Sequence, residues 1–135
     1  MKYTADEFVL YKPSILAAAV TDASTDGTGV DTKGYDECLV IFDAILAAAN
    51  AEGDVHIEES SDDSTYTDIT GAVFTQVTPS NDVASMVGRL DMRKHKRYLR
   101  AVLATDGSNA FTGSVGFALI NPKAGPAVQT AIFDK

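Results

Sequence analysis

The chain has 135 residues, a net charge of −8, a single cysteine, no tryptophan and a hydrophobic fraction of 45%. This length fits one domain, and the composition excludes a disordered, collagen-like or coiled-coil chain. One cysteine excludes an internal disulfide, and we expect a soluble protein without a signal peptide, because no apolar stretch approaches the roughly 18 residues that cross a bilayer.

Short apolar runs separated by turn residues predict strands rather than helices. The run at 35–46 predicts a central strand covered on both faces, because Cys38–Phe42 is apolar at every position. Strict alternation after Val55 predicts a half-buried strand with His56 and Glu58 pointing outward. The other elements expected in this half are a strand at 14–20, a polar stretch with turns at 21–34 and a loop at 47–53.

The second half opens with a predicted hairpin, in which Ser61–Ser64 forms the turn. Residues 82–92 fit either a helix or a strand, and we favour a strand because Gly88 and two β-branched valines weaken a helix. We expect that strand to pair with Lys96–Ala104 through a turn at Arg93–His95. The remaining expected strands cover residues 66–69, 73–77 and 110–120.

This pattern predicts a mainly β fold, either a β-sandwich or a small β-barrel, of about seven to eight short antiparallel strands. We assign residues 13–120 to the β domain, 1–12 to an extended N-terminal arm and 121–135 to an extended C-terminal arm. The arms carry aromatic and apolar side chains that can reach a partner, or they complete edge strands of their own sheet.

Charge is unevenly distributed between the two halves. Residues 1–68 contain 15 acidic and 3 basic side chains, whereas residues 69–135 contain 4 and 8. Six cations form what we call the basic strip: Arg89, Arg93, Lys94, Lys96, Arg97 and Arg100. These cations can pair with the acidic half within the fold or between copies. We favour such a charge-paired interface over nucleic-acid binding, because a chain of net charge −8 repels phosphates.

No pattern of catalytic residues stands out, so we expect a protein that is not an enzyme and has no cofactor. His56 and Glu58 share a strand face, but two ligands do not make a metal site, and the other histidine, His95, lies among cations. Asp62 and Asp63 lack the spacing of a calcium loop. We interpret Cys38 as a buried hydrophobe rather than a nucleophile.

Three blocks of the sequence resemble small virion proteins of tailed bacteriophages. These blocks are Gly34–Ile41, the hairpin Ile57–Ile69 and Lys96–Val102, and they occur here in the same order. The resemblance implies a structural protein of the phage head, most similar to a decoration (cement) protein that binds the outer capsid surface. Such proteins commonly work as trimers, and the resemblance supplies no catalytic residues.

We therefore expect a homotrimer in the virion, on the capsid exterior, assembled in the host cytoplasm, with the major capsid protein as its partner and without a nucleic acid or membrane partner. A head–tail joining or tail component, and a carbohydrate-binding or enzymatic β-sandwich, are the alternatives. The residues we expect at the interface are Arg93, Lys96, Arg97, Tyr98, Arg100, Tyr3, Phe8, Tyr11, Ile132 and Phe133.

Overall fold

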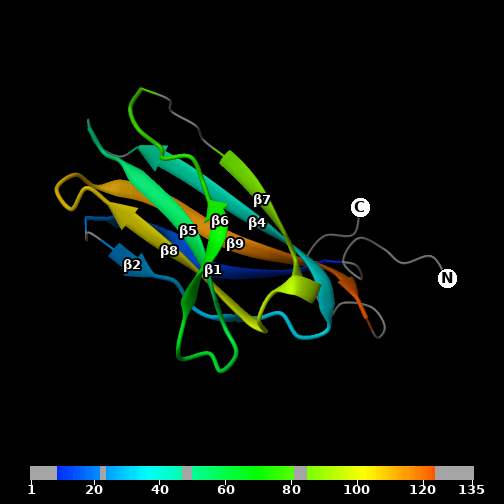
Figure 1. The fold of residues 1–135 in the computed structure, drawn as a ribbon. Helices are drawn as coiled ribbons and strands as arrows, with labels where there is room; N and C mark the ends of the chain where they lie inside the picture. Colours follow the sequence, from blue (N-terminus) through cyan, green and yellow to red (C-terminus); the bar gives the residue numbers. More distant parts are fainter. Residues whose placement is uncertain (1–8, 22–23, 47–49, 81–84, 124–135) are drawn as a thin grey trace, which may run out of the picture.

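The computed structural model describes residues 9–21, 24–46, 50–80 and 85–123 as two antiparallel sheets packed face to face (Figure 1). One sheet has the order β1-β9-β4-β7, and the other has the order β2-β8-β5-β6, with β3 also paired to β8. The predicted mainly β fold is confirmed as a sandwich, because the two sheets do not close into a barrel.

The elements in chain order are β1 Val9–Val20, β2 Ser24–Asp26, β3 Val30–Asp31, β4 Tyr35–Leu46, β5 Gly53–Ser60, β6 Thr67–Val73, β7 Ser85–Asp91, the short 3-10 turn η1 Met92–Lys94, β8 Tyr98–Thr105 and β9 Phe111–Pro122.

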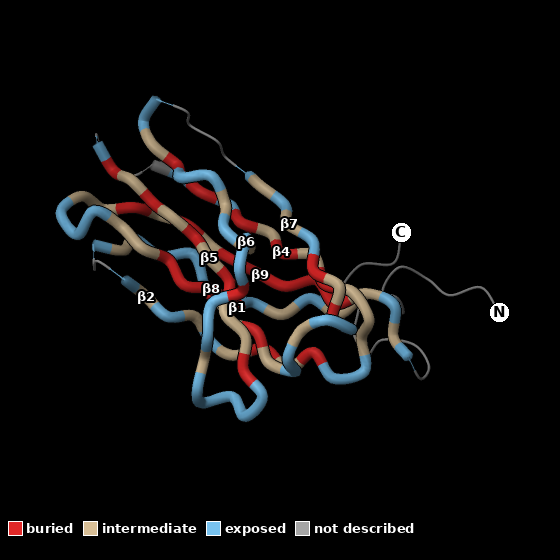
Figure 2. The backbone as a smooth tube through the Cα atoms, viewed as in Figure 1, coloured by how far each residue is buried: buried red, intermediate tan, exposed pale blue. Residues whose placement is uncertain are grey.

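The hydrophobic core lies between the inner faces of the two sheets (Figure 2). Alternate residues of each central strand point into it, as the period of two requires. From the four-stranded sheet come Cys38, Val40, Phe42, Phe111, Val115, Phe117 and Leu119. From the five-stranded sheet come Val55, Ile57, Leu99, Ala101 and Leu103. The predicted outward positions of His56 and Glu58 are confirmed, because Val55 and Ile57 are the buried residues of β5.

The strand predicted at 35–46 has the same bounds as β4, but it is not covered on both faces. Its even-numbered residues from Cys38 to Ala44 are buried, whereas Ile45 is 71% exposed. The prediction of two covered faces was wrong because the second sheet packs on only one side of β4, and the described residues place no element over the other side.

Within the segment 82–92, Ser85–Asp91 is a strand, as predicted, and residues 82–84 lie outside the described residues; the partner of this strand is not Lys96–Ala104. β7 pairs with β4, with Met86 opposite Phe42, and β8 pairs with β5 in the other sheet. Between them, η1 buries Met92 at the corner and Asp91 caps the turn by accepting a hydrogen bond from the Arg93 amide. The chain therefore crosses from one sheet to the other, across a gap of about 10 Å between packed sheets.

Two further predictions need correction. The polar stretch 21–34 contains β2 and β3, which are strands because β8 supplies partners for their backbone groups. After β2, the Gly27 amide donates to the Ala101 carbonyl, which holds the connection to β3 against β8. Residues 73–77 are not a separate strand, because β6 ends at Val73 and Val77 forms only an isolated bridge with Gly53.

Parts of both predicted arms belong to the sheet. Residues 9–12 begin β1, where Val9 pairs with Ile120, and residues 121–122 end β9, where Pro122 pairs with Tyr35. Residues 1–8 and 124–135 lie outside the described residues. Among the described residues, no helix is long and apolar enough to cross a membrane.

Candidate functional site

The basic strip is paired with acidic groups of the same chain. Each of its arginines has a carboxylate partner: Arg89 with Glu37, Arg93 with Asp91, Arg97 with Asp31, and Arg100 with Asp26 and Glu58. Except for Asp91, these acids come from the acidic half. The sequence left open whether the two halves attract each other within the fold or between copies, and the structure shows pairing within the fold.

Arg100 lies at the centre of the outer face of the five-stranded sheet. Its Nε donates to Glu58 Oε2 at 2.5 Å, its Nη1 lies 3.0 Å from Asp26 Oδ2, and its guanidinium stacks 4.4 Å from the Tyr66 ring centre. Burial disfavours the charge of Arg100, but the hydrogen bond to Glu58 raises its pKa above the ordinary value. Arg100 of β8 thus contacts side chains of β5, of β2 and of the loop that joins β5 to β6.

Arg97 ties the start of β8 to β3. Its Nε and Nη2 donate to the two oxygens of Asp31 at 2.8 and 2.6 Å, a two-point contact that suits the planar guanidinium. This hydrogen bonding lowers the pKa of Asp31 and raises that of Arg97. The backbone carbonyl oxygen of Arg97 also accepts a hydrogen bond from the Thr32 hydroxyl at 2.6 Å.

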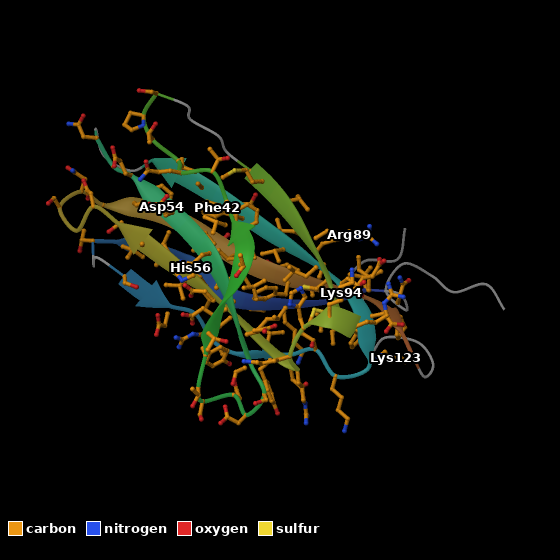
Figure 3. All side chains as sticks on the ribbon, viewed as in Figure 1. Phe42, Asp54, His56, Arg89, Lys94 and Lys123 are labelled. Carbon is orange, nitrogen blue, oxygen red and sulfur yellow. The ribbon has the colours of Figure 1, made fainter. Side chains whose placement is uncertain are left out.

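The predicted interface residues do not form one surface. Arg97, Tyr98 and Arg100 lie on the five-stranded sheet or its border, whereas Tyr11 lies on β1 of the other sheet. Figure 3 shows Arg89 and Lys94 at the same end of the sandwich as Lys123, far along the molecule from His56. Tyr3, Phe8, Ile132 and Phe133 lie outside the described residues.

Lys96 of the basic strip and its sequence neighbour His95 also have partners within the chain. Lys96 Nζ donates to Thr67 Oγ1 at 3.1 Å, and the Lys96 amide donates to Glu59 Oε2 at 3.0 Å. The same carboxylate oxygen lies 3.0 Å from His95 Nδ1. His95 therefore contacts an acid, although its sequence neighbours are cations.

The outer face of the four-stranded sheet carries many apolar side chains, and no element of the described residues covers it. The register of β1, β9, β4 and β7 places its side chains in adjacent rows, with Tyr11 beside Ala118 and Ile41 beside Val87. Exposed fractions are 47% for Tyr11, 62% for Val87 and 71% for Ile45. We call this surface the apolar face and define it by Tyr11, Leu39, Ile41, Ile45, Val87, Ala118 and Ile120.

Part of the apolar face lies on a strand whose apolar run predicts burial on both sides. Ile41 and Ile45 belong to the strand that we expected to be covered on both sides. A contact between Tyr11 and β9 also shapes the face, because the Tyr11 ring occupies the space beside Gly116 where any larger residue would place its Cβ atom. Its described charges include Arg89 and Glu37, which pair with each other.

A groove of about 610 Å³ opens between β6 and β7, where each sheet ends. Core side chains form much of its lining: Val40, Ile57, Ile69, Phe74, Met86 and Leu90. Arg89 and His95 also contribute to it. Such a lining suits an apolar group more than a charged one.

Cys38 is fully buried in the core. Burial raises the pKa of its thiol to about 12, so it stays protonated at neutral pH. A protonated, buried thiol packs as a small hydrophobe and is a poor nucleophile.

Comparisons with known proteins identify a fold neighbour. No protein-family model matches the chain, and no curated protein matches it. Among solved structures, the crystal structure of the SPBc2 prophage-derived protein YomS is similar, with a TM-score of 0.52 over 82% of this chain and 92% of that one. The two sequences are 9% identical, so the likeness concerns the fold.

Proposed function

We propose that this chain is a non-enzymatic structural protein of a bacteriophage virion, which binds the outer capsid surface and stabilises the head. The observation that carries the proposal is the apolar face, which extends across four strands and exposes Ile45 and Val87. Large uncovered apolar surfaces mark sites of protein association. The fold likeness to a prophage-derived protein and the resemblance of three sequence blocks to phage virion proteins support the same role.

Association through the apolar face does not depend on long-range charge attraction. The chain carries a net charge of −8, so long-range forces do not favour its approach to another acidic surface. On the apolar face, Arg89 pairs with Glu37 and the carboxylate of Asp43 is exposed, so a partner that covers the apolar side chains leaves the pair intact and must accommodate one carboxylate. A shell presents the same surface many times, so a homotrimer gains by multivalency what one modest contact lacks.

The proposal is tested by adding the purified chain to capsids that lack it and measuring saturation stoichiometry and heat resistance. We expect saturable binding and a raised disruption temperature for the capsid. Absence of binding at every concentration would refute the proposal. The mass of the free protein gives a second check, since a trimer agrees with decoration, whereas a ring of six or more subunits agrees with head–tail joining.

Two exposed valines provide a matched pair of variants. Val87→Asp places a charge on the apolar face, whereas Val73→Asp places the same charge on β6, at nearly equal exposure of 62% and 63%. We expect Val87→Asp to weaken capsid binding at least tenfold, an effect of about 1.4 kcal/mol, and Val73→Asp to leave it unchanged. Equal binding by the two variants would contradict the assignment of the apolar face to the capsid.

A further inference from the structure

Three side chains of metal-ligand type meet on the outer face of the five-stranded sheet: His56, Glu58 and Asp68. The alternation of β5 sends His56 and Glu58 outward, and the antiparallel pairing places Asp68 of β6 opposite Glu58. Sequence spacing alone offered only the two residues of β5. The third comes from the neighbouring strand, across a hairpin.

An irregularity in β6 brings the group together. His56 pairs with Val73 and Glu58 pairs with Asp68, so the β6 chain between these pairs is longer than the β5 chain. The extra residues form a bulge that includes Gly71, whose φ of 83° favours glycine. Bulges of this kind redirect side chains and are frequent beside binding sites.

The distances fit the coordination sphere of one small cation. His56 Nε2 lies 3.4 Å from Asp68 Oδ1 and 3.9 Å from Glu58 Oε1, and all three atoms lie within 4.8 Å of one another. Around a tetrahedral zinc ion with bonds of about 2.0–2.1 Å, neighbouring ligand atoms are separated by about 3.4 Å. Small side-chain rotations therefore suffice to place all three atoms on one ion.

The surroundings orient one ligand and keep the site negative. Arg100 holds Oε2 of Glu58 at 2.5 Å, which leaves Oε1 facing His56. Hydrogen-bonded carboxylates of this type are common around bound metals. Arg100 pairs with the carboxylates of Glu58 and Asp26, and the carboxylate of Asp68 lies beside His56, so the acids of the group outnumber its one arginine and the local charge favours a cation.

We propose that His56, Glu58 and Asp68 bind a divalent transition-metal ion of the zinc type. One imidazole nitrogen and two carboxylate oxygens suit zinc, cobalt or nickel better than calcium or magnesium, which prefer oxygen ligands alone. Asp68 is 75% exposed, so the ion enters from solvent and a water molecule completes the tetrahedron. The bound ion joins edge strand β6 to β5. The proposal is independent of the virion role.

The test is calorimetric titration of the metal-free full chain with zinc chloride, together with its melting temperature in excess zinc. We expect one ion per chain and a raised melting temperature, since an ion that binds only the folded state stabilises it. His56→Ala and Asp68→Asn should each weaken zinc binding at least tenfold. Circular dichroism of both variants without metal establishes that they are folded.

Two control variants separate coordination from general attraction. His95→Ala removes the other histidine of the chain, and Asp54→Asn removes a negative charge from the same strand, two residues before His56. Both should bind zinc within about twofold of the unchanged chain. Cobalt in place of zinc should show the absorption of a four-coordinate ion, and lose it in His56→Ala. Absence of zinc binding, or equal loss in the His95→Ala control, would overturn the proposal.

Discussion

The outer faces of the two sheets differ in how they contribute to the molecule. On the five-stranded sheet, Arg100 connects β8 to β5, to β2 and to the hairpin loop through Glu58, Asp26 and Tyr66. On the four-stranded sheet, the apolar face exposes Ile45 and Val87 to solvent. Side chains on the outer face of the five-stranded sheet, which we call the charged face, therefore contact other parts of the chain, whereas Ile45 and Val87 of the apolar face are largely exposed to solvent.

This difference separates stability from association. A hydrophobic side chain that remains in water contributes little to folding, because the free energy comes from the area removed from water. A paired cation of low exposure matters to folding, because its loss leaves a carboxylate without a partner. We therefore expect substitutions on the charged face to change folding stability and substitutions on the apolar face to change association.

The largest expected effect compares the two sides of the four-stranded sheet. Phe117→Ala, on the buried side, should lower the free energy of unfolding by about 3–5 kcal/mol, because it leaves a cavity beneath fully buried neighbours. Ile45→Ala, on the apolar face, should lower it by no more than about 0.5 kcal/mol. Urea denaturation measures both. A loss above about 2 kcal/mol for Ile45→Ala would show that the apolar face supports the fold.

A smaller effect is expected for Arg100→Ala on the charged face. The side chain of Glu58 is only 14% exposed, so removal of Arg100 leaves a largely buried carboxylate without its cation. We expect this to lower the free energy of unfolding by about 2 kcal/mol. Arg89→Ala, whose side chain is 65% exposed on the apolar face, is the matched control and should cost less. If the Arg89 variant unfolds at lower urea than the Arg100 variant, the two faces do not differ as we describe.

The local elements were predictable because their signals are periodic and close in sequence. The alternation from Val55 identified β5 and its outward residues, and the run at 35–46 matched β4. The turn at Ser61–Ser64 was recognisable because short oxygen-bearing side chains cap their own backbone there: Asp62 accepts hydrogen bonds from the amides of Ser64 and Thr65.

The predictions that failed depend on contacts between distant segments. Nothing within Ser85–Asp91 indicates that its partner is β4 rather than the next strand along the chain. The apolar run of β4 indicates burial, but the number of covered faces depends on where the second sheet packs. The same holds for the metal-ligand group, because the position of Asp68 beside His56 follows from the bulge in β6. Charge imbalance predicted attraction between the halves, but not which pairs form.

The smallest expected effect concerns the acid sensitivity of the hairpin loop between β5 and β6. Amide hydrogen bonds from Thr65, a hydroxyl bond from Ser60 and an amide bond from Ser64 lower the pKa of Asp62 well below its ordinary value of 3.8. The folded chain therefore binds fewer protons at this site than the unfolded chain. The contribution of ionised Asp62 to the stability of the fold is complete above pH 3.8 and is lost as the pH falls further.

Asp62→Asn should have a lower melting temperature than the unchanged chain at pH 7, and the difference in melting temperature should shrink toward pH 2. Ser60→Ala removes the hydroxyl donor to Asp62 but keeps the amide donors. Its loss of stability at pH 7 should therefore be smaller than that of Asp62→Asn. A gap between the Asp62→Asn variant and the unchanged chain that stays constant from pH 7 to pH 2 would show that the charge of Asp62 does not stabilise the hairpin.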